Sequence, residues 1–347
     1  MNVQLSFHKK VMHFKQPAGT SRGVYTTRTS WIVTAKEARR QDDAEGWGEC
    51  APLPDLSCDA MPDPEYETVL ARLLRATETQ GGIDYDALCP YPSMLFGIET
   101  ALLDLQNGGR RIVYDTPFTH GEEGIRINGL VWMGNFDEML ARLKTKMHEG
   151  FHCVKLKIGA IDFQHELDLV RHIRGAFTKE QIELRLDANG GFAYEDAMNR
   201  LEQLALYDIH SIEQPIRQHQ WQRMAELCKA SPIPIALDEE LIGVNTPGEK
   251  EALLDTVRPQ YIILKPSLHG GIHGSEEWIR MASERGIGSW ITSALESNIG
   301  LNAVAQFAAH TYPDAARRMP QGLGTGMLFT DNIDMPLQIK EDKLWRT

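Results

Sequence analysis

Six charged side chains occur where short apolar segments of the sequence end, and their types suit proton transfer beside a metal ion. They are Lys155 and Lys157 in FHCVKLKIGA, Asp187 closing ELRLD, Glu213 closing SIE, Asp238 closing PIALD and Lys265 closing YIILK. From Lys157 onward, the intervals are 30, 26, 25 and 27 residues. Each interval is about one strand-and-helix unit, so these groups are expected on consecutive parallel strands, whose carboxyl ends share one rim.

The three carboxylates predict a metal site at that rim. Asp187, Glu213 and Asp238 would converge from adjacent strands, and carboxylates so close raise one another's pKa values unless a cation intervenes. Three oxygen ligands without histidine or cysteine select a hard cation, with Mg²⁺ the first choice and Mn²⁺ a possible substitute. Each acid could instead cap a helix, but the regular spacing of the three favours metal ligation.

The lysines predict a base and its tuning groups. Lys155 and Lys157 share one face of a strand whose other face is apolar. Lowering a lysine pKa from about 10.4 to about 7–8 requires roughly 3–5 kcal/mol of unfavourable environment for the cation. A neighbouring ammonium and a divalent metal supply it, so Lys157 is the expected proton-transfer group and Lys155 its tuner. Lys265 faces them across the site, an arrangement that suits abstraction of a proton α to a carboxylate.

Three further residues near these strand ends have open assignments. Arg185 shares a face with Asp187, so it either lines the cavity or forms a structural ion pair. Asn189 either orients a ligand or shapes the turn after its strand. Glu239 either pairs with one of the lysines or has no part in the site.

The elements that position these residues alternate from about residue 125 onward between short apolar strands and amphipathic helices. Seven or eight such units in about 200 residues predict a parallel barrel. The rival, a doubly wound open sheet, lacks its Gly-x-Gly-x-x-Gly turn after the first strand. The glycine-rich GLGTG at 322–326 comes at the end of the series and is expected to be a turn or a wall of the site.

The N-terminal part has a different pattern. Residues 1–50 look rich in strands, a proline- and aspartate-rich loop follows, and helices are expected near 66–78 and in PSMLFGIETALLDLQ, which Asn107 and Gly108 would end. We expect an α+β domain over 1–110, the barrel over 125–325 and a tail over 326–347.

Composition restricts the partners. The chain has 347 residues and a net charge of −12, which argues against nucleic acid and anionic membranes but leaves a small anionic carboxylate substrate open. The N-terminus lacks the apolar core of a signal peptide, and no apolar run is long enough to span a membrane. Five cysteines without a Cys-x-x-Cys pair are expected to be reduced in the cytoplasm. No sequence feature indicates an oligomeric state.

The order Lys-x-Lys, Asp, Glu, Asp, Lys resembles the enolase superfamily, in its muconate-lactonizing subgroup. The resemblance covers nearly the whole chain. It implies an α/β fold with a modified (β/α)7β barrel of the TIM type, and a capping domain built from the N-terminal segment and the C-terminal tail.

Within that subgroup, TSALESNIGLNAVAQFAAH, QGLGTGMLFTDNI and PAGTSRGVYTTRTSW are similar to the o-succinylbenzoate synthase family. The resemblance implies a Mg²⁺-dependent lyase that dehydrates 2-succinyl-6-hydroxy-2,4-cyclohexadiene-1-carboxylate to 2-succinylbenzoate in menaquinone synthesis. Lys157 would remove the α-proton and then protonate the departing hydroxyl, while Lys265 would stabilise the enediolate. It also implies substrate contacts from Ser293 and Glu296 and, in an N-terminal loop, from Arg22 and Gly23.

Two alternatives remain at this point. A dipeptide epimerase or N-acylamino acid racemase on the same scaffold would use both lysines as bases, one on each face. A barrel that has lost catalysis and serves as a binding protein is the other, and the intact lysines and carboxylates argue against it.

Overall fold

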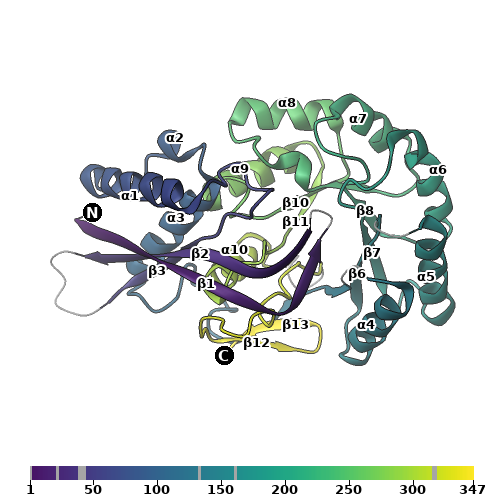
Figure 1. The fold of residues 1–347 in the computed structure, drawn as a ribbon, viewed down its shortest axis with the longest axis horizontal. Helices are drawn as coiled ribbons and strands as arrows, with labels where there is room; N and C mark the ends of the chain where they lie inside the picture. Colours follow the sequence, from purple (N-terminus) through teal and green to yellow (C-terminus); the bar gives the residue numbers. More distant parts are fainter. Residues whose placement is uncertain (1, 21–22, 38–43, 132–133, 160–161, 315–318) are drawn as a thin grey trace.

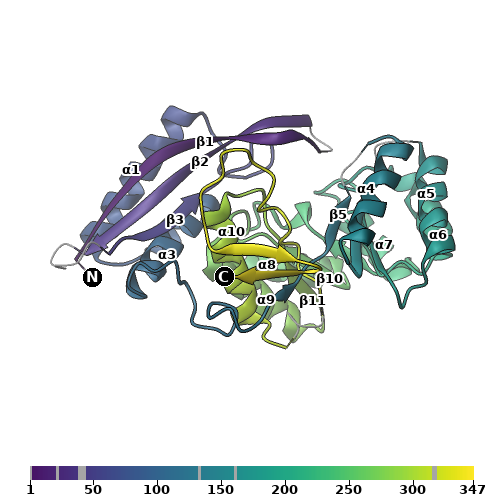
Figure 2. The same ribbon diagram turned by 90° about the horizontal axis from the view of Figure 1, so that it is seen from below.

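The computed structural model describes residues 2–20, 23–37, 44–131, 134–159, 162–314 and 319–347. An N-terminal sheet with its helices lies beside a larger assembly of parallel strands and helices (Figures 1 and 2). The N-terminal elements are β1 (Val3–Thr20), β2 (Gly23–Glu37), β3 (Gly46–Cys50), α1 (Asp63–Gln80), α2 (Tyr85–Leu88) and α3 (Pro92–Gln106). The strands form an antiparallel sheet in the order β1-β2-β3, on which α1 and α3 pack.

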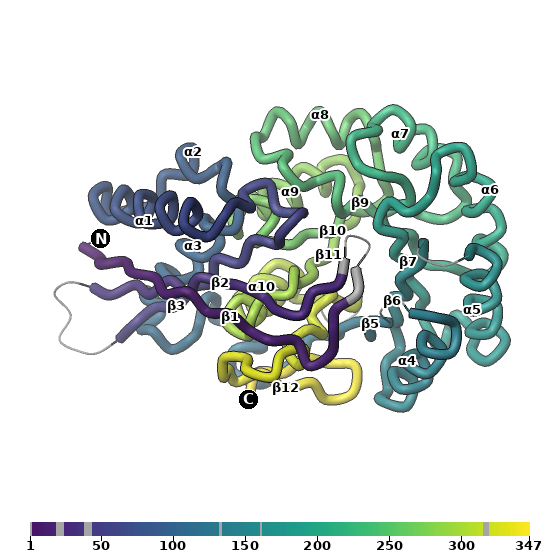
Figure 3. The backbone as a smooth tube through the Cα atoms, in the orientation of Figure 1, coloured from purple at the N-terminus to yellow at the C-terminus, as the bar shows by residue number. Residues whose placement is uncertain are grey.

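The strands β1 and β2 form one long hairpin. Its register runs from Val3 opposite Glu37 to Thr20 opposite Gly23, with a shift between His13 and Ala18. Figure 3 shows the hairpin extending from the N-terminal domain across to the parallel strands. The hairpin therefore forms part of one wall of the cavity at the ends of the parallel strands.

Seven parallel strands form the second sheet, in the order β5 to β11 along the chain. Its strands are β5 (Gly129–Val131), β6 (Cys153–Lys157), β7 (Glu183–Asp187), β8 (Ser211–Glu213), β9 (Ile235–Leu237), β10 (Tyr261–Leu264) and β11 (Gly288–Ile291). The α-helices after them are α4 (Phe136–His148), α5 (Phe163–Ala176), α6 (Tyr194–Ala205), α7 (Trp221–Ala230), α8 (Pro247–Val257), α9 (Gly271–Glu284) and α10 (Asn298–Thr311), and a short 3₁₀ helix, η1 (Glu239–Leu241), follows β9.

Two single bridges close the cylinder. Gln321 pairs in parallel with Ile127, and Gly322 pairs in parallel with Thr292, so residues 321–322 take the position of the eighth strand. This arrangement confirms the predicted barrel with a capping domain, and its strand order is that of a closed parallel barrel.

The C-terminal segment returns to the N-terminal part of the chain. A small antiparallel sheet contains β12 (Leu337–Lys340), β13 (Lys343–Arg346) and β4 (Ile125–Arg126). Before it, the Lys15 N–H donates to the carbonyl of Leu328 at 2.8 Å, and the Thr330 N–H donates to the carbonyl of His13 at 2.9 Å. The domain boundaries at 110, 125 and 325 remain predictions.

Alternation along the strands decides which side chains reach the barrel interior. In β6, Val154 and Leu156 are buried in one cluster with Leu143 of α4 and Val170 of α5, because the outward face of the strand packs on these helices. Lys155 and Lys157, which alternate with these residues, are partly buried and point the other way, into the barrel. The helix predicted near 66–78 corresponds to α1, and α3 ends before Asn107 as predicted.

Two carboxylates of the N-terminal domain cap barrel helices. Glu49 on β3 accepts hydrogen bonds from the N–H groups of Ser297 and Gly300, each at 2.9 Å, at the start of α10. Glu99 on α3 accepts from the Ile272 N–H at 2.6 Å, at the start of α9. A helix N-terminus favours negative charge, so these contacts dock the domain on the barrel. No helix in the described residues is both long and apolar enough to cross a bilayer.

Candidate active site

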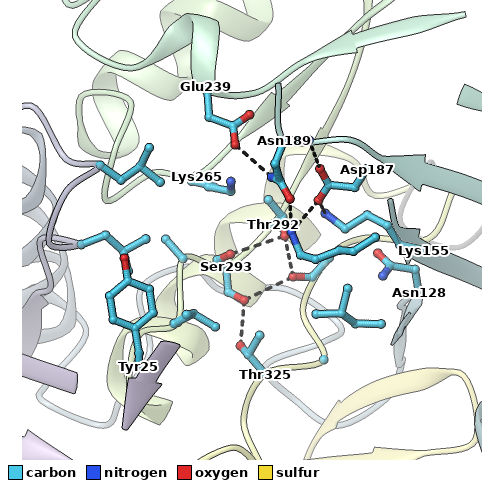
Figure 4. Close-up of a pocket in the computed structure, with 18 residues that line it drawn as sticks. Tyr25, Asn128, Lys155, Asp187, Asn189, Glu239, Lys265, Thr292, Ser293 and Thr325 are labelled. Atoms are coloured by element: carbon cyan, nitrogen blue, oxygen red, sulfur yellow. Dashed lines mark hydrogen bonds and ion pairs between the residues drawn. The ribbon is translucent and has the colours of Figure 1, made fainter. Parts of the chain in front are cut away.

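A cavity of about 130 Å³ opens where the parallel strands end. Charged residues from β6, β7, η1 and the end of β10 line one part of it (Figure 4). The first barrel strand, the segment after β11 and residues 322–325 line another part, and three residues of the N-terminal domain complete the lining. Its residues are Tyr25, Leu53, Leu56, Asn128, Leu130, Lys155, Lys157, Asp187, Asn189, Glu239, Lys265, Thr292, Ser293, Ala294, Leu295, Gly322, Gly324 and Thr325. A cavity therefore lies at the strand ends where the sequence spacing predicts the charged residues to meet.

The lysine pair of β6 contacts the carboxylates of the neighbouring strands. Lys155 Nζ lies 3.2 Å from Asp187 Oδ2 and 3.0 Å from Glu213 Oε2. Lys157 Nζ lies 2.9 Å from the same Asp187 oxygen and donates to Asn189 Oδ1 at 2.7 Å. Both lysine side chains are only 11–12% exposed, so their charges are balanced mainly by these partners.

Lys265 faces this pair from the end of β10. Its ammonium forms a short ion pair with Asp238, and its side chain is 13% exposed. Its backbone N–H donates to Nδ1 of the buried His269 at 2.9 Å, which holds the strand end in place. The lysines thus approach the cavity from two sides, because three strands lie between β6 and β10.

Burial and carboxylates act in opposite directions on the lysine pKa values. Burial alone would lower the pKa of Lys155, but Glu213 and Asp187 outweigh it and the pKa is raised. The pKa of Lys265 is raised for the same reason, with Asp238 as the main partner. The surrounding carboxylates therefore hold these two lysines in the charged form.

The three predicted metal ligands lie on adjacent strands. Asp187 and Glu213 are direct partners in the β7–β8 register, and Asp238 follows β9. Burial would raise the pKa of Asp187, but Lys157 and Lys155 outweigh it and lower that pKa. Burial and the charge of Asp187 raise the pKa of Glu213 well above its ordinary value. Of the three carboxylates, Glu213 is therefore the one whose charge the neighbouring lysines compensate least.

The donor set fits a hard divalent cation. All three groups offer oxygen, which Mg²⁺ prefers, and the buried Oδ1 of Asp238 has no hydrogen-bond partner in the described part of the chain. As the side chains stand, no three His, Cys, Asp or Glu residues among those described are arranged to hold a metal ion. The ammonium groups of Lys155 and Lys265 contact the carboxylate oxygens that a metal would take.

Asn189 links the base candidate to a second buried acid. Its side-chain carbonyl accepts from Lys157, and its amide donates to Glu239 Oε1 at 2.9 Å. The other oxygen of Glu239 is buried without a partner among the described residues. Burial, together with the charge of Asp238, raises the pKa of Glu239 to about 7. Asn189 also adopts a left-handed backbone with φ of 44°, so it both shapes the turn and orients Lys157.

Neutral polar groups form another wall. Ser293 Oγ lies 2.7 Å from Thr325 Oγ1, and Thr292 Oγ1 donates to the carbonyl of Gly322 at 2.9 Å. Figure 4 shows Tyr25 on the opposite side of the cavity from Lys155 and Asp187. The sequence-predicted Ser293 therefore lines the cavity, and GLGTG forms part of its wall as expected.

Two predicted substrate contacts lie away from the cavity. Arg185 is buried, with an exposed fraction of 2%. Its guanidinium pairs with Glu183 at 2.7 Å and lies 4.6 Å from the centre of the Trp290 ring. It shares a face with Asp187, but two residues of strand set it about 6–7 Å deeper in the barrel. Arg185 therefore forms a structural ion pair, which is one of the two roles that the sequence left open.

Glu296 is the second predicted substrate contact that does not line the cavity. The Glu296 carboxylate is buried and accepts from Ser267 Oγ at 2.5 Å and from the Ala294 N–H at 2.6 Å, so it shapes the segment after β11 without lining the cavity. Arg22 lies outside the described residues. Gly23 is the first residue of β2 and pairs with Thr20.

Sequence reasoning missed several lining residues. Tyr25 follows Gly23 by two positions, inside the segment already expected to face substrate. Asn128 is a polar residue within the otherwise apolar strand segment IRINGLVW, and this exception could have indicated a residue of the site. Leu53 and Leu56 come from the proline-rich loop after β3, and no local pattern distinguishes them from loop residues that only pack.

Comparisons with known proteins agree with this geometry. Residues 138–344 match the family described as enolase C-terminal domain-like, and residues 20–105 match the MenC N-terminal domain. The o-succinylbenzoate synthase of Desulfotalea psychrophila is 46% identical, over 97% of each chain. The crystal structure of MenC from the same organism has a TM-score of 0.83 at 41% identity, covering 99% of this chain and 100% of that one.

A more distant structure shares the architecture. The dipeptide epimerase of Enterococcus faecalis, complexed with Mg and the dipeptide L-Leu-L-Tyr, has a TM-score of 0.79 at 20% identity, covering 100% of this chain and 97% of that one. At that identity, the likeness shows the fold alone. The matching family models and the relative 46% identical over nearly its full length show that the chain belongs to the o-succinylbenzoate synthase family of the enolase superfamily.

Proposed function

We propose that this protein catalyses the dehydration of 2-succinyl-6-hydroxy-2,4-cyclohexadiene-1-carboxylate to 2-succinylbenzoate, a step of menaquinone synthesis. The observation that carries the proposal is the pair of facing lysines, Lys157 and Lys265, over a triad of buried carboxylates in a chain 46% identical to an o-succinylbenzoate synthase. Its substrate is a small anionic carboxylate, for which three ammonium groups around one cavity are suited.

Lys157 is the proposed base. In its neutral form, it removes the ring proton α to the carboxylate, and the carbon–oxygen bond of the ring hydroxyl then breaks. The same side chain returns the proton to the departing hydroxide, so water leaves and the ring becomes aromatic. Its hydrogen bond to Asn189 at 2.7 Å supports a fixed position for the nitrogen.

Lys265 and Lys155 have electrostatic roles in this proposal. Lys265 stays protonated and stabilises the negative charge that develops on the substrate carboxylate when the α-proton leaves. Its raised pKa is consistent with that charge state. Lys155 lies beside Lys157 on the same strand, where its fixed positive charge disfavours a second ammonium.

Asp187, Glu213 and Asp238 are the proposed ligands of Mg²⁺, with Mn²⁺ as a substitute. When bound, the ion would fix the substrate carboxylate and offset its growing negative charge. The raised pKa of Glu213, caused by burial and by Asp187, supports this assignment, as does the buried Asp238 oxygen that has no partner among the described residues. Lys155 and Lys265 would then be released from their carboxylate contacts and become available to the substrate.

The direct test is conversion of the cyclohexadiene substrate by the purified protein. We expect 2-succinylbenzoate to form with Mg²⁺ and its formation to stop with EDTA. Lys157→Ala should lower kcat by roughly 10²–10⁴-fold, the usual share of a general base. Lys229→Ala, at an exposed site on α7, serves as the matched control. Absence of product with Mg²⁺ present would overturn the proposal.

The epimerase and racemase alternative predicts a different outcome. Such an enzyme would exchange the α-proton of a dipeptide or an N-acylamino acid with solvent deuterium, and both lysines would act as bases. Exchange without turnover of the cyclohexadiene would replace the proposed function with this one. If Lys157→Ala left every activity unchanged, a non-catalytic binding role would be favoured instead.

The cellular setting is also a proposal. The acidic net charge of −12 supports a protein that does not bind nucleic acid or anionic membranes, and five cysteines without a paired motif support the cytoplasm.

A further inference from the structure

A buried arginine of the N-terminal domain joins three segments of the chain beside the candidate active site. Arg28 on β2 is 3% exposed, and each nitrogen of its guanidinium donates to a backbone carbonyl. Nη2 donates to Ala51 at 2.6 Å, and Nη1 donates to Pro52 through a short hydrogen bond and to the adjacent Thr29 at 3.4 Å. Nε donates at 3.2 Å to Leu295, which follows β11 of the barrel. The side chain therefore ties the N-terminal domain to the barrel.

The guanidinium is held by uncharged groups. In the described part of the chain, its direct partners are all backbone carbonyls. Burial lowers the pKa of Arg28, and the charges of Glu296 and Glu49 oppose that shift. Because a buried charge is costly, a residue that only filled this space would be better apolar. The planar fork of arginine, however, reaches several carbonyls at once.

The segments that Arg28 holds supply an apolar wall of the cavity, defined here as Tyr25, Leu53 and Leu295. Tyr25 lies three residues before Arg28 on the same strand, Leu53 directly follows Pro52, and all three wall residues line the cavity. Leu53 and Leu295 belong to one buried apolar cluster, on which Tyr25 packs. Figure 4 shows Tyr25 across the cavity from the charged residues.

The backbone of Leu295 depends on its contacts. Its φ is 63°, a left-handed conformation that leucine rarely adopts. Residues in such conformations persist where the surrounding structure holds them, and they concentrate at functional sites. Arg28 holds the carbonyl of Leu295, and the Glu296 carboxylate holds the preceding residue by accepting from the Ala294 N–H at 2.6 Å. The arginine thus helps to fix a wall residue in place.

We infer that Arg28 is a positioning residue for substrate binding, which holds the apolar wall at contact distance from the ring of the substrate. The inference rests on the proposed function, because the ring belongs to that substrate. Arg28 does not line the cavity, so it acts through the wall. A gap of about 0.5–1 Å removes roughly a quarter to a half of each dispersion contact. A small displacement of the wall therefore weakens binding without touching the lysines or the carboxylates.

Replacement of Arg28 by methionine tests this inference in the full-length protein with Mg²⁺. Methionine keeps an unbranched apolar chain but donates no hydrogen bond. The Kd of 2-succinylbenzoate should rise by about tenfold, equal to about 1.4 kcal/mol, and the KM of the cyclohexadiene by a similar factor. The kcat should change less than about threefold, and the Kd of Mg²⁺ less than about twofold, because the lysines and carboxylates keep their own contacts.

Arg174→Met is the matched control. Arg174 on α5 also donates to backbone carbonyls, those of Tyr207 and Ile182 at 2.8 Å and that of Asp208 at 2.9 Å. These carbonyls precede β7 and β8, at the end of the barrel opposite the cavity. The control substitution should lower the melting temperature and leave the affinities for 2-succinylbenzoate and Mg²⁺ unchanged.

Arg28→Lys decides the matter if thermal unfolding shows that Arg28→Met does not fold. Lysine keeps the positive charge, but its single nitrogen cannot bridge the segments. The Kd of 2-succinylbenzoate should again rise, by about three- to tenfold, with the Mg²⁺ affinity unchanged. The inference is overturned if the Arg28 variants change only the melting temperature, as Arg174→Met does, or if they weaken both ligands equally. Failure of the proposed function is distinct, because it appears as no turnover of the cyclohexadiene by the unaltered protein.

Discussion

At the residue scale, the site depends on how a few side chains hold one nitrogen. Lys157 Nζ has two fixed partners, Asp187 and Asn189, and Asn189 is itself held by Glu239. Asp187 is also a proposed metal ligand, so a bound ion would compete for its oxygens. Asn189 then remains as the contact that orients the proposed base.

Replacement of Asn189 by glycine should separate position from binding. Glycine accepts the left-handed backbone of this position but removes both hydrogen bonds, so kcat should fall by roughly 10–100-fold, the scale of a small misplacement of a reacting group. The KM should change less, because Asn189 orients the base. Steady-state kinetics with the cyclohexadiene measures both, and Asp208→Gly, at an exposed position that is also left-handed, is the control. An unchanged kcat would contradict this role.

At the element scale, two carboxylates on the N-terminal domain accept hydrogen bonds at the starts of barrel helices: Glu99 at α9, which has no side-chain cap, and Glu49 at α10, beside the local cap Ser297. Glu49 receives two N–H groups from the start of α10 and a hydroxyl hydrogen bond from Ser30 at 2.6 Å. These helices follow β10 and β11, which carry or adjoin Lys265 and Ser293. The docking of the domain and the position of the site are therefore coupled through helix ends.

Removal of one such carboxylate should destabilise the whole fold. Glu49→Ala leaves two buried N–H groups and two hydroxyls without their acceptor, so the free energy of unfolding should fall by about 2–4 kcal/mol. Urea unfolding at neutral pH measures the change. Glu202→Ala, at an exposed position in α6, should change it by less than about 0.5 kcal/mol. Equal effects of both substitutions would show that Glu49 makes no special contact.

A buried acid at the start of α3 predicts a pH dependence of stability. Asp59 Oδ2 accepts from Ser93 N and Oγ at 2.8 and 2.6 Å, while burial raises the pKa of Asp59 from 3.8 to about 6. Between these values, the unfolded chain loses the proton and the folded chain keeps it. Stability should therefore fall by roughly 3 kcal/mol as pH rises from about 4 to about 6, and stay level above.

Asp59→Asn isolates this effect because asparagine does not titrate. The difference in unfolding free energy between the parent and Asp59→Asn should shift by roughly 3 kcal/mol in favour of the variant across that pH range. Urea unfolding of both proteins at several pH values between 4 and 7 measures the shift. Parallel stability curves would mean that Asp59 ionises equally in both states.

At the scale of the whole molecule, three strands must meet for a metal to bind, so binding should stabilise the complete fold. Mg²⁺ at about 100 times its Kd should add about 2.7 kcal/mol to the free energy of unfolding. Thermal unfolding with and without Mg²⁺ measures this without any substrate. Glu213→Gln should lose most of the increase, whereas Glu202→Gln should keep it. The same increase in all three proteins would argue against the proposed ligands.

The six charged residues, their order and the alternation of strands and helices can all be predicted from the sequence. These features are local: the spacing of about one strand-and-helix unit and the alternation within a strand can be read along the chain. The structure accordingly brings Lys157, Asp187 and Lys265 to one cavity, as their positions at strand ends predict.

The depth of each side chain in the barrel, and the identity of the distant segments that cover the strand ends, follow from the folded structure. Arg185 shares a face with Asp187, yet the barrel places it a layer deeper, against Trp290. Tyr25 and Leu53 reach the cavity because the hairpin and the loop after β3 fold back over the strand ends. Such contacts join residues far apart in the sequence, and their geometry follows from packing that no local spacing encodes.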